Sequence, residues 1–169
     1  SALLPVGGAS IAVLPFSNLS GEAEQDYFSD GITNDLITAL SKFRELLVIA
    51  SNTIFTYKGK PVNIEHVGQE LGVRYVLEGS VQKAGERVRI NAQLVDGLTG
   101  RHLWAERYDR KIGDIFALQD DITKHVVTAL EVKLTEGEAA RVQRRQTDNT
   151  EAYDLFRRAV EQYRRFTKV

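Results

Sequence analysis

The sequence predicts a mixed α/β fold (α+β in arrangement): a five-stranded sheet of parallel and antiparallel strands, flanking helices, and further helices toward the C-terminus. Three observations predict it. The first third places a helical apolar stripe between two continuous apolar runs, which is typical of a parallel strand–helix–strand unit. The middle third alternates apolar and polar residues between glycine-containing turns, which indicates an antiparallel meander. The last third returns to a helical period.

The parallel unit begins with a strand over residues 11–16, whose continuous apolar run is typical of a strand buried on both faces. The helix after it carries apolar residues three or four positions apart, namely Phe28, Ile32, Leu36, Leu40 and Phe43. A second buried strand is predicted over residues 46–50. We expect a right-handed crossover between these two strands.

A short second helix is predicted between Asn63, a good N-cap, and Gly72, which supplies the C-terminal stop. From Val73 onward the apolar period changes to two. Turns at residues 84–87 and 96–100 then separate three strands, the last of which is "RHLWAERYDR" at residues 101–110. The meander should therefore have one apolar face and one polar face.

A third long helix is predicted from "GDIF" to about residue 134, and the Arg-rich stretch that follows has no apolar stripe. The chain is expected to divide into four segments. These are a linker or cloning remnant at residues 1–9, an α/β domain at 10–135, a polar helical linker at 136–149 and the start of a helical region at 150–169.

Composition excludes several classes of function. The 169 residues include 22 basic and 23 acidic side chains, so the net charge of -1 gives no overall field that would attract nucleic acid. The chain has no Cys, which excludes disulfides, thiolate metal sites and cysteine nucleophiles. No apolar run approaches the roughly 20 residues that span a bilayer, so we expect no membrane insertion by this chain.

Several long blocks resemble a known family: "SIAVLPFSNLSGEAEQDYFSDGITNDLITAL", "FTYKGK", "VGQELGVRYVLEGSVQKAGERVRINAQLVDGLTGRHLWAERYDR" and "DIFALQDDIT". Together they are similar to the TolB amino-terminal-like domain, which follows the catalytic domain in many bacterial class III adenylate/guanylate cyclases and also occurs in tetratricopeptide-containing transcriptional regulators. The resemblance covers about residues 10–135 and implies a mixed sheet with flanking helices. The segment from Thr150 resembles the opening helix of a tetratricopeptide array.

The loop between the first strand and the first helix raises the question of phosphate binding, because it has the strand–glycine–helix order of phosphate cradles. It lacks both G-x-x-x-x-G-K-[ST] and G-x-G-x-x-G. Its lone Gly21 is followed by Glu22, Glu24 and Asp26, which would repel a phosphate. The sequence therefore predicts a shaped connector.

No catalytic, metal or cofactor-binding residues are predicted. The three histidines, His66, His102 and His125, lie in different elements without a metal-binding spacing. Ser29 and Asp30, near the start of the first long helix, are interpreted as caps, since no base is indicated beside them. The metal-binding aspartates that class III cyclases need belong to a different domain, so we expect this chain not to be an enzyme.

Five residues of the meander form a candidate interaction surface: Arg87, Arg89, Trp104, Arg107 and Tyr108. Alternation places Trp104 and Tyr108 on one strand face with His102 and Glu106, where packing is favoured over binding. The three arginines either bind an anion or acidic partner, or belong to a solvated face on which they pair with Glu78, Glu86 or Glu106.

Two functions are consistent with these observations. The first is a non-catalytic regulatory and protein-interaction module of a bacterial signalling protein, coupling an upstream output domain to downstream tetratricopeptide helices. The alternative is a small-ligand or nucleotide sensor with its pocket at the carboxyl ends of the first two strands. Expected partners are other proteins or the remaining domains of its own chain, with a homodimer through the C-terminal helix, and no nucleic acid. We expect a cytoplasmic location, or the periplasm if a transmembrane segment precedes the chain.

Overall fold

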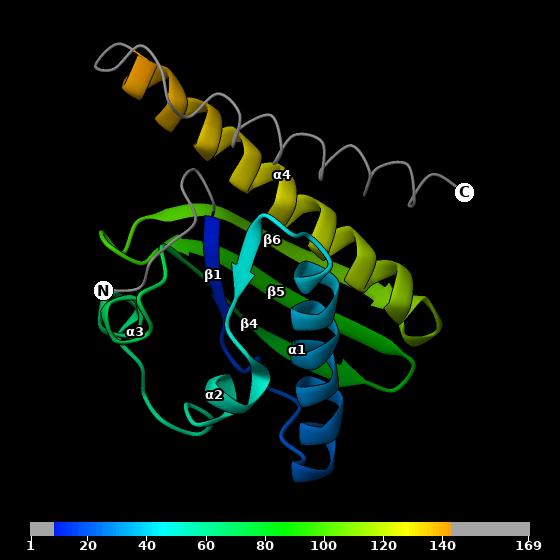
Figure 1. Cartoon of the computed structure of the whole chain (residues 1–169). Coiled ribbons are helices and arrows are strands. Elements are labelled where there is room, and N and C mark those ends of the chain that lie inside the picture. Colours follow the sequence, from blue (N-terminus) through cyan, green and yellow to red (C-terminus); the bar gives the residue numbers. More distant parts are fainter. Residues whose placement is uncertain (1–8, 143–169) are drawn as a thin grey trace.

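The computed structural model describes residues 9–142, and it confirms the predicted mixed α/β fold (Figure 1). The main path of the sheet has the order β3-β1-β4-β5-β6, and a sixth, two-residue strand, β2, pairs with β4. The strands are β1 (Ala9–Val13), β2 (Ser17–Asn18), β3 (Leu46–Val48), β4 (Tyr75–Ala84), β5 (Arg87–Asp96) and β6 (His102–Lys111).

The parallel half of the sheet comprises β3, β1 and the first residues of β4, which pair in parallel on either side of β1. All five residues of β1 are buried, as its continuous apolar run predicts. A turn of 3-10 helix, η1 (Ala23–Gln25), leads into α1 (Asp26–Ser41), which then connects to β3. The predicted stripe is confirmed, because Ile32, Leu36 and Leu40 are all buried.

Two short helices connect β3 to β4. The predicted helix is α3 (Ile64–Leu71), in which the Asn63 side chain accepts a hydrogen bond from the backbone N–H of His66 at 3.1 Å. Gly72 ends it with a φ of 67°, a conformation that glycine adopts at little cost. The other helix, α2 (Ser51–Phe55), was not predicted, because five residues are too few to show a helical period.

The antiparallel half comprises the rest of β4 with β5 and β6, each strand ten residues long. On β5, Val88, Ile90 and Ala92 are buried while Arg87 and Arg89 are exposed, which confirms the predicted alternation. A β-bulge interrupts the pairing of β5 with β6 at Leu94 and Val95. The meander therefore has one buried face and one polar face.

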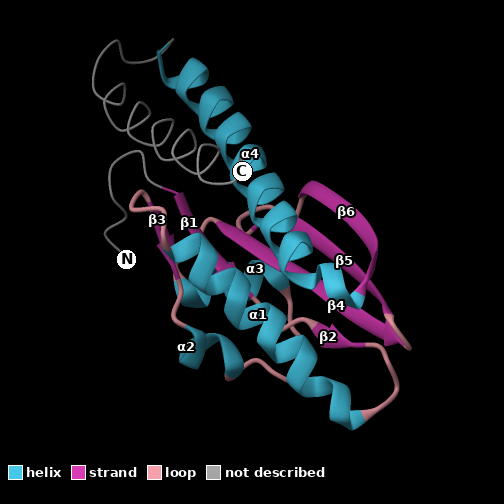
Figure 2. Ribbon diagram, turned by 90° about the vertical axis from the view of Figure 1, so that its right-hand side faces the viewer, coloured by secondary structure: helices cyan, strands magenta, loops and turns pink. Residues whose placement is uncertain are grey.

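The helices cover the two faces of the sheet unequally. Figure 2 shows α1 and α4 (Ile115–Val142) together on the near side of the sheet. Figure 1 places α3 on the other side of β1 from α1. Helix α4 follows a 3-10 turn, η2 (Ile112–Asp114), and packs against β6 and α1. We call the polar face of β4, β5 and β6, opposite α1 and α4, the open face.

Helix α4 continues past its predicted end near residue 134 to Val142. The added residues include Glu, Ala and Arg, which favour helix, and the cost of about 1 kcal/mol for a glycine at 137 does not stop it. Of the predicted segments, residues 1–8, the end of the polar linker and the tetratricopeptide-like region lie outside the described residues. Within residues 9–142, no helix is long and apolar enough to cross a membrane.

Candidate functional site: the open face of the meander

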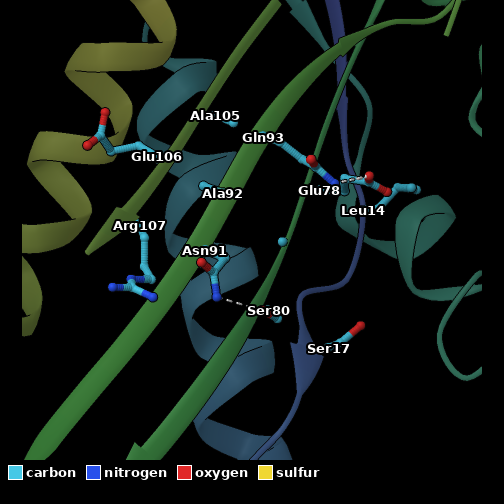
Figure 3. Close-up of a pocket in the computed structure, with 11 residues that line it drawn as sticks. Leu14, Ser17, Glu78, Ser80, Asn91, Ala92, Gln93, Ala105, Glu106 and Arg107 are labelled. Carbon is cyan, nitrogen blue, oxygen red and sulfur yellow. Dashed lines mark hydrogen bonds between the residues drawn. The ribbon is translucent and has the colours of Figure 1, made fainter. Parts of the chain in front are cut away.

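The open face carries a broad, shallow hollow with a volume of about 570 Å³ (Figure 3). Its floor is the middle of β4, β5 and β6, and one wall comes from Leu14 and Ser17, just beyond β1. A second hollow of about 270 Å³ lies farther along the same strands, around Arg87, Arg89 and Asp109. The sensor pocket was predicted at the carboxyl ends of β1 and β3. The larger hollow includes Leu14, at the end of β1, but no residue at the end of β3, so the two locations overlap only in part.

Cross-strand register arranges the side chains of the open face in four rows, because residues paired directly across neighbouring strands point to the same face. In order along the strands, the rows are Glu78/Gln93/Ala105, Ser80/Asn91/Arg107, Gln82/Arg89/Asp109 and Ala84/Arg87/Lys111. The rows carry four cationic and two anionic side chains, and the cations concentrate toward the Ala84 end.

Polar side chains in the larger hollow are joined in pairs between β4 and β5. Gln93 donates a hydrogen bond from Nε2 to a carboxylate oxygen of Glu78. Asn91 donates from Nδ2 to the hydroxyl of Ser80 at 3.4 Å. Figure 3 shows Arg107 beside Asn91 on the neighbouring strand, and 61% of the Arg107 side chain is exposed. The floor of the hollow thus presents amides, a hydroxyl, a carboxylate and a guanidinium to solvent.

Asp109 is the acidic partner of the arginines on this face. Arg89 donates from Nε to its Oδ1 at 2.7 Å, and the Nε of Arg107 lies 3.7 Å from its Oδ2. The hydrogen bond from Arg89 lowers the pKa of the Asp109 carboxyl, and the charges of Arg107 and Arg87 add to the effect. Sequence reasoning proposed glutamates as partners and missed Asp109, because only the register places it opposite Arg89.

Trp104 and Tyr108 do not share the open face with the three arginines. They pair with Leu94 and Ile90, whose side chains are buried, and they contact His125 of α4. The Tyr108 hydroxyl lies 2.6 Å from Nδ1 of His125, and the two rings stack with centroids 5.9 Å apart. Burial raises the pKa of the Tyr108 phenol, as do the charges of Glu106 and Asp121.

The bulge in β6 corrects one expectation from simple alternation. His102 pairs with Val95 and Trp104 pairs with Leu94, so the two side chains face opposite sides despite their spacing of two. His102 is exposed, whereas Trp104 is half-buried against α4. The five candidate residues therefore divide into an arginine group on the open face and an aromatic pair that packs under α4.

The loop before α1 is a hydrogen-bonded connector. Two of its backbone N–H groups are already used: that of Leu19 donates to the Val81 carbonyl and that of Ser20 to Oδ1 of Asn18. The side chain of Asn18 in turn donates to Oδ1 of Asp26 in the first turn of α1 at 2.8 Å. Two amides of the loop are thus unavailable to a phosphate, and the carboxylate of Asp26 at the helix start would repel one.

The expected capping roles of Ser29 and Asp30 are wrong. Helix α1 begins at Asp26, so both residues lie inside it. Ser29 is buried and its hydroxyl donates to the Gln25 carbonyl, whereas Asp30 pairs with Lys58 at 2.6 Å. Among the side chains that the structure describes, those of residues 9–131, no three His, Asp or Glu residues gather in a way that could hold a metal ion.

The open face presents hydrogen-bonding groups and charges in register across its three strands. Sequence reasoning identified three of its arginines but missed the amides and hydroxyl of the hollow, and Lys111. The alternation of polar and apolar residues along each strand was the signal that could have identified these residues as lying on the polar face. The cross-strand register that brings these residues into rows requires the structure.

Comparison with solved structures finds the same fold in two proteins of low sequence identity. The lipoprotein GNA1162 from Neisseria meningitidis matches 70% of this chain and 96% of its own, with a TM-score of 0.54 and 23% identity. TolB from Acinetobacter baumannii matches 73% of this chain and 28% of its own, with a TM-score of 0.54 and 19% identity. These likenesses show the fold alone.

Sequence comparison identifies the family. Residues 7–125 match the family model described as HilA/YgeH-like transcriptional regulator, second domain, and the chain belongs to that family. The resemblance to the TolB amino-terminal-like domain is supported at the level of the fold, which TolB shares, whereas the family model that matches is the HilA/YgeH-like one. The chain is also 61% identical over 150 residues to "Putative adenylate cyclase 3" of Rhizobium meliloti (strain 1021), covering 89% of this chain but only 26% of that protein.

Proposed function

We propose that this chain is a non-catalytic regulatory and protein-interaction module of a bacterial signalling protein, attached downstream of a class III adenylate or guanylate cyclase domain. One observation carries the proposal. The same folding unit matches the second domain of transcriptional regulators and about a quarter of a protein named as an adenylate cyclase. Because those proteins have different outputs, the unit they share is expected to supply control or binding rather than output chemistry.

The open face supports this proposal. It is a polar sheet surface with two hollows, built on strands whose other face is held by the core and by α4. The partners would be the remaining domains of the same protein or other proteins. The module would work in the cytoplasm, where a cyclase finds its nucleoside triphosphate.

The proposal can be tested in the Rhizobium meliloti relative. Cyclic AMP synthesis is compared among that full-length protein, a variant lacking the segment that matches this chain, and a chimera that carries this chain in its place. We expect the deletion to retain turnover but change its rate more than threefold, and the chimera to restore the full-length rate. A deletion without effect would contradict the proposal, as would cyclic AMP synthesis by this chain alone that survives purification.

A small-ligand sensor is the second candidate, and the larger hollow favours it, since about 570 Å³ lies within the usual size range of ligand pockets. A thermal-shift screen of nucleotides and metabolites distinguishes the two functions. A ligand at a hundred times its dissociation constant would add about 2.7 kcal/mol to the free energy of unfolding. We expect millimolar ATP, GTP or cyclic AMP to raise the melting temperature by less than about 1 °C, and a saturable rise of several degrees would favour the sensor.

A further inference from the structure

The last row of the open face is electrostatically unfavourable within the chain itself. Arg87 and Lys111 are directly opposite each other on β5 and β6, and the third position in the row is Ala84. Like charges in that position repel each other. Within the described part of the chain, neither side chain has a hydrogen bond or an ion pair. The row itself contains no carboxylate, and Asp109 of the neighbouring row, whose pKa the charge of Arg87 helps to lower, is hydrogen-bonded to Arg89.

Arg107 provides a third cation with unused hydrogen-bonding capacity. Among the side chains of residues 9–131 it makes no hydrogen bond, and its one ionic contact, to Asp109, spans 3.7 Å. Asp109 itself is engaged by Arg89 at 2.7 Å. The carboxylate of Asp109 is therefore the one negative charge in the three rows that hold the four cations. The planar guanidinium of Arg107 can still bind a further carboxylate with two hydrogen bonds.

We propose that the open face docks an acidic protein segment, whose carboxylates pair with Arg107 at one position and with Arg87 and Lys111 at another. This inference rests on the proposed function as an interaction module and names the chemistry of its partner. Arg107 and Lys111 are four residues apart on β6, which corresponds to about 13 Å along a strand. An extended segment with acidic residues at positions i and i+4 matches that spacing, and position i+2 lies over the Arg89–Asp109 pair.

Charge favours a protein segment over a nucleic acid or an anionic membrane. The carboxylate of Asp109 lies among the cations and that of Glu78 lies at the other end of the same face, and both would repel a partner with uniform negative charge. A peptide can leave neutral or basic side chains at those points. The amides of Asn91 and Gln93 offer hydrogen bonds that suit a peptide backbone.

The test uses a fluorescent 20-residue peptide of repeating Glu-Ser-Ser-Ser, which places glutamates four residues apart, and fluorescence anisotropy at low salt. The variant Arg87→Glu/Lys111→Glu removes the proposed site. Lys60→Glu/Lys124→Glu is the matched control, because it changes the net charge equally at exposed residues away from the open face. We expect at least tenfold weaker binding for the open-face variant and less than twofold for the control. Equal losses in both variants, or no loss in either, would overturn the proposal.

Further measurements test other ligands of the open face and control for loss of the fold. A peptide with Gln in place of Glu should bind at least tenfold more weakly. Tighter binding of a single-stranded DNA 20-mer or of phosphatidylserine vesicles, lost in the same variant, would overturn the proposal in favour of a phosphate-bearing partner. If the reversed charges prevent folding, Arg87→Gln/Lys111→Gln should still weaken binding at least threefold. Normal regulation in the cyclase chimera with no peptide binding would reject this surface while leaving the proposed function intact.

Discussion

The two halves of the sheet bury their strands differently. In the parallel half, β1 and the first residues of β4 are buried on both faces, between α1 on one side and α3 on the other. In the antiparallel half, only the face toward α1 and α4 is buried, and the open face carries charged and amide side chains in rows. Buried side chains of both halves form the core, but only the antiparallel half also has a polar face on which side chains can change without loss of core packing.

Strand β4 contains both environments in ten residues. Tyr75, Val76 and Leu77 are consecutive and all buried, whereas from Glu78 onward the strand exposes part of its surface. This change occurs where β4 leaves β1, its parallel neighbour, and continues beside β5. Substitutions along this one strand should therefore separate fold from function.

The largest effect is expected for Leu77→Ala. Leu77 is completely buried and pairs with Val13, so the substitution leaves a cavity and should lower the free energy of unfolding by about 2–5 kcal/mol. Gln82→Ala on the same strand should change it by less than about 0.5 kcal/mol, because Gln82 is exposed. Urea denaturation measures both. Similar losses at the two positions would contradict the division of the sheet.

An intermediate effect is expected for Tyr108→Phe, which removes the hydroxyl that contacts His125. A hydrogen bond of this kind contributes about 0.5–1.5 kcal/mol, and the ring packing is retained. The same urea experiment applies, with His125→Ala and the double variant completing a thermodynamic cycle. If the two single effects add fully, the contact does not couple β6 to α4.

The alkaline titration of Tyr108 tests its burial independently. Its folded-state pKa is raised above the usual value of 10.0, mainly by burial, so the neutral phenol is favoured in the folded protein. The resulting stability is fully present below pH 10 and is lost as the pH rises through the folded pKa. Burial also raises the pKa of Tyr57, so absorbance at 295 nm should show a late phase of tyrosine ionisation, and Tyr108→Phe should reduce the amplitude of that phase. If Tyr108→Phe instead removed a tyrosine that ionises near the ordinary pKa of 10.0, Tyr108 would be solvated.

The smallest effect is expected at the Arg89–Asp109 pair on the open face. The pKa of Asp109 is lowered, first by the hydrogen bond from Arg89, so the pair stabilises the fold above the unfolded pKa of about 3.9. This contribution is lost as the pH falls through the folded value. The stability difference between the wild type and Asp109→Asn should therefore be small at pH 6 and absent at about pH 2. A difference that persists in acid would mean that the carboxylate charge is not its cause.

Sequence reasoning succeeded where a pattern had a local physical cause. Continuous burial of β1, the stripe of α1, and the Asn63 and Gly72 boundaries of α3 all follow from neighbouring residues. It failed where the cause was a partner distant in sequence. The bulge that separates His102 from Trp104, the Tyr108–His125 contact and the rows of the open face depend on register and packing between elements.

Residue mapping by NMR tests the central claim most directly, namely that the open face of the antiparallel half is the docking surface. Backbone amide shifts of the ¹⁵N-labelled chain are followed during titration with the unlabelled Glu-Ser-Ser-Ser peptide. The account predicts saturable shifts concentrated at Arg87, Arg89, Asn91, Arg107 and Lys111, with little change in α1 and α3. Saturable shifts centred on α1, on α3 or on the aromatic contact with α4, with the open face unchanged, would contradict it.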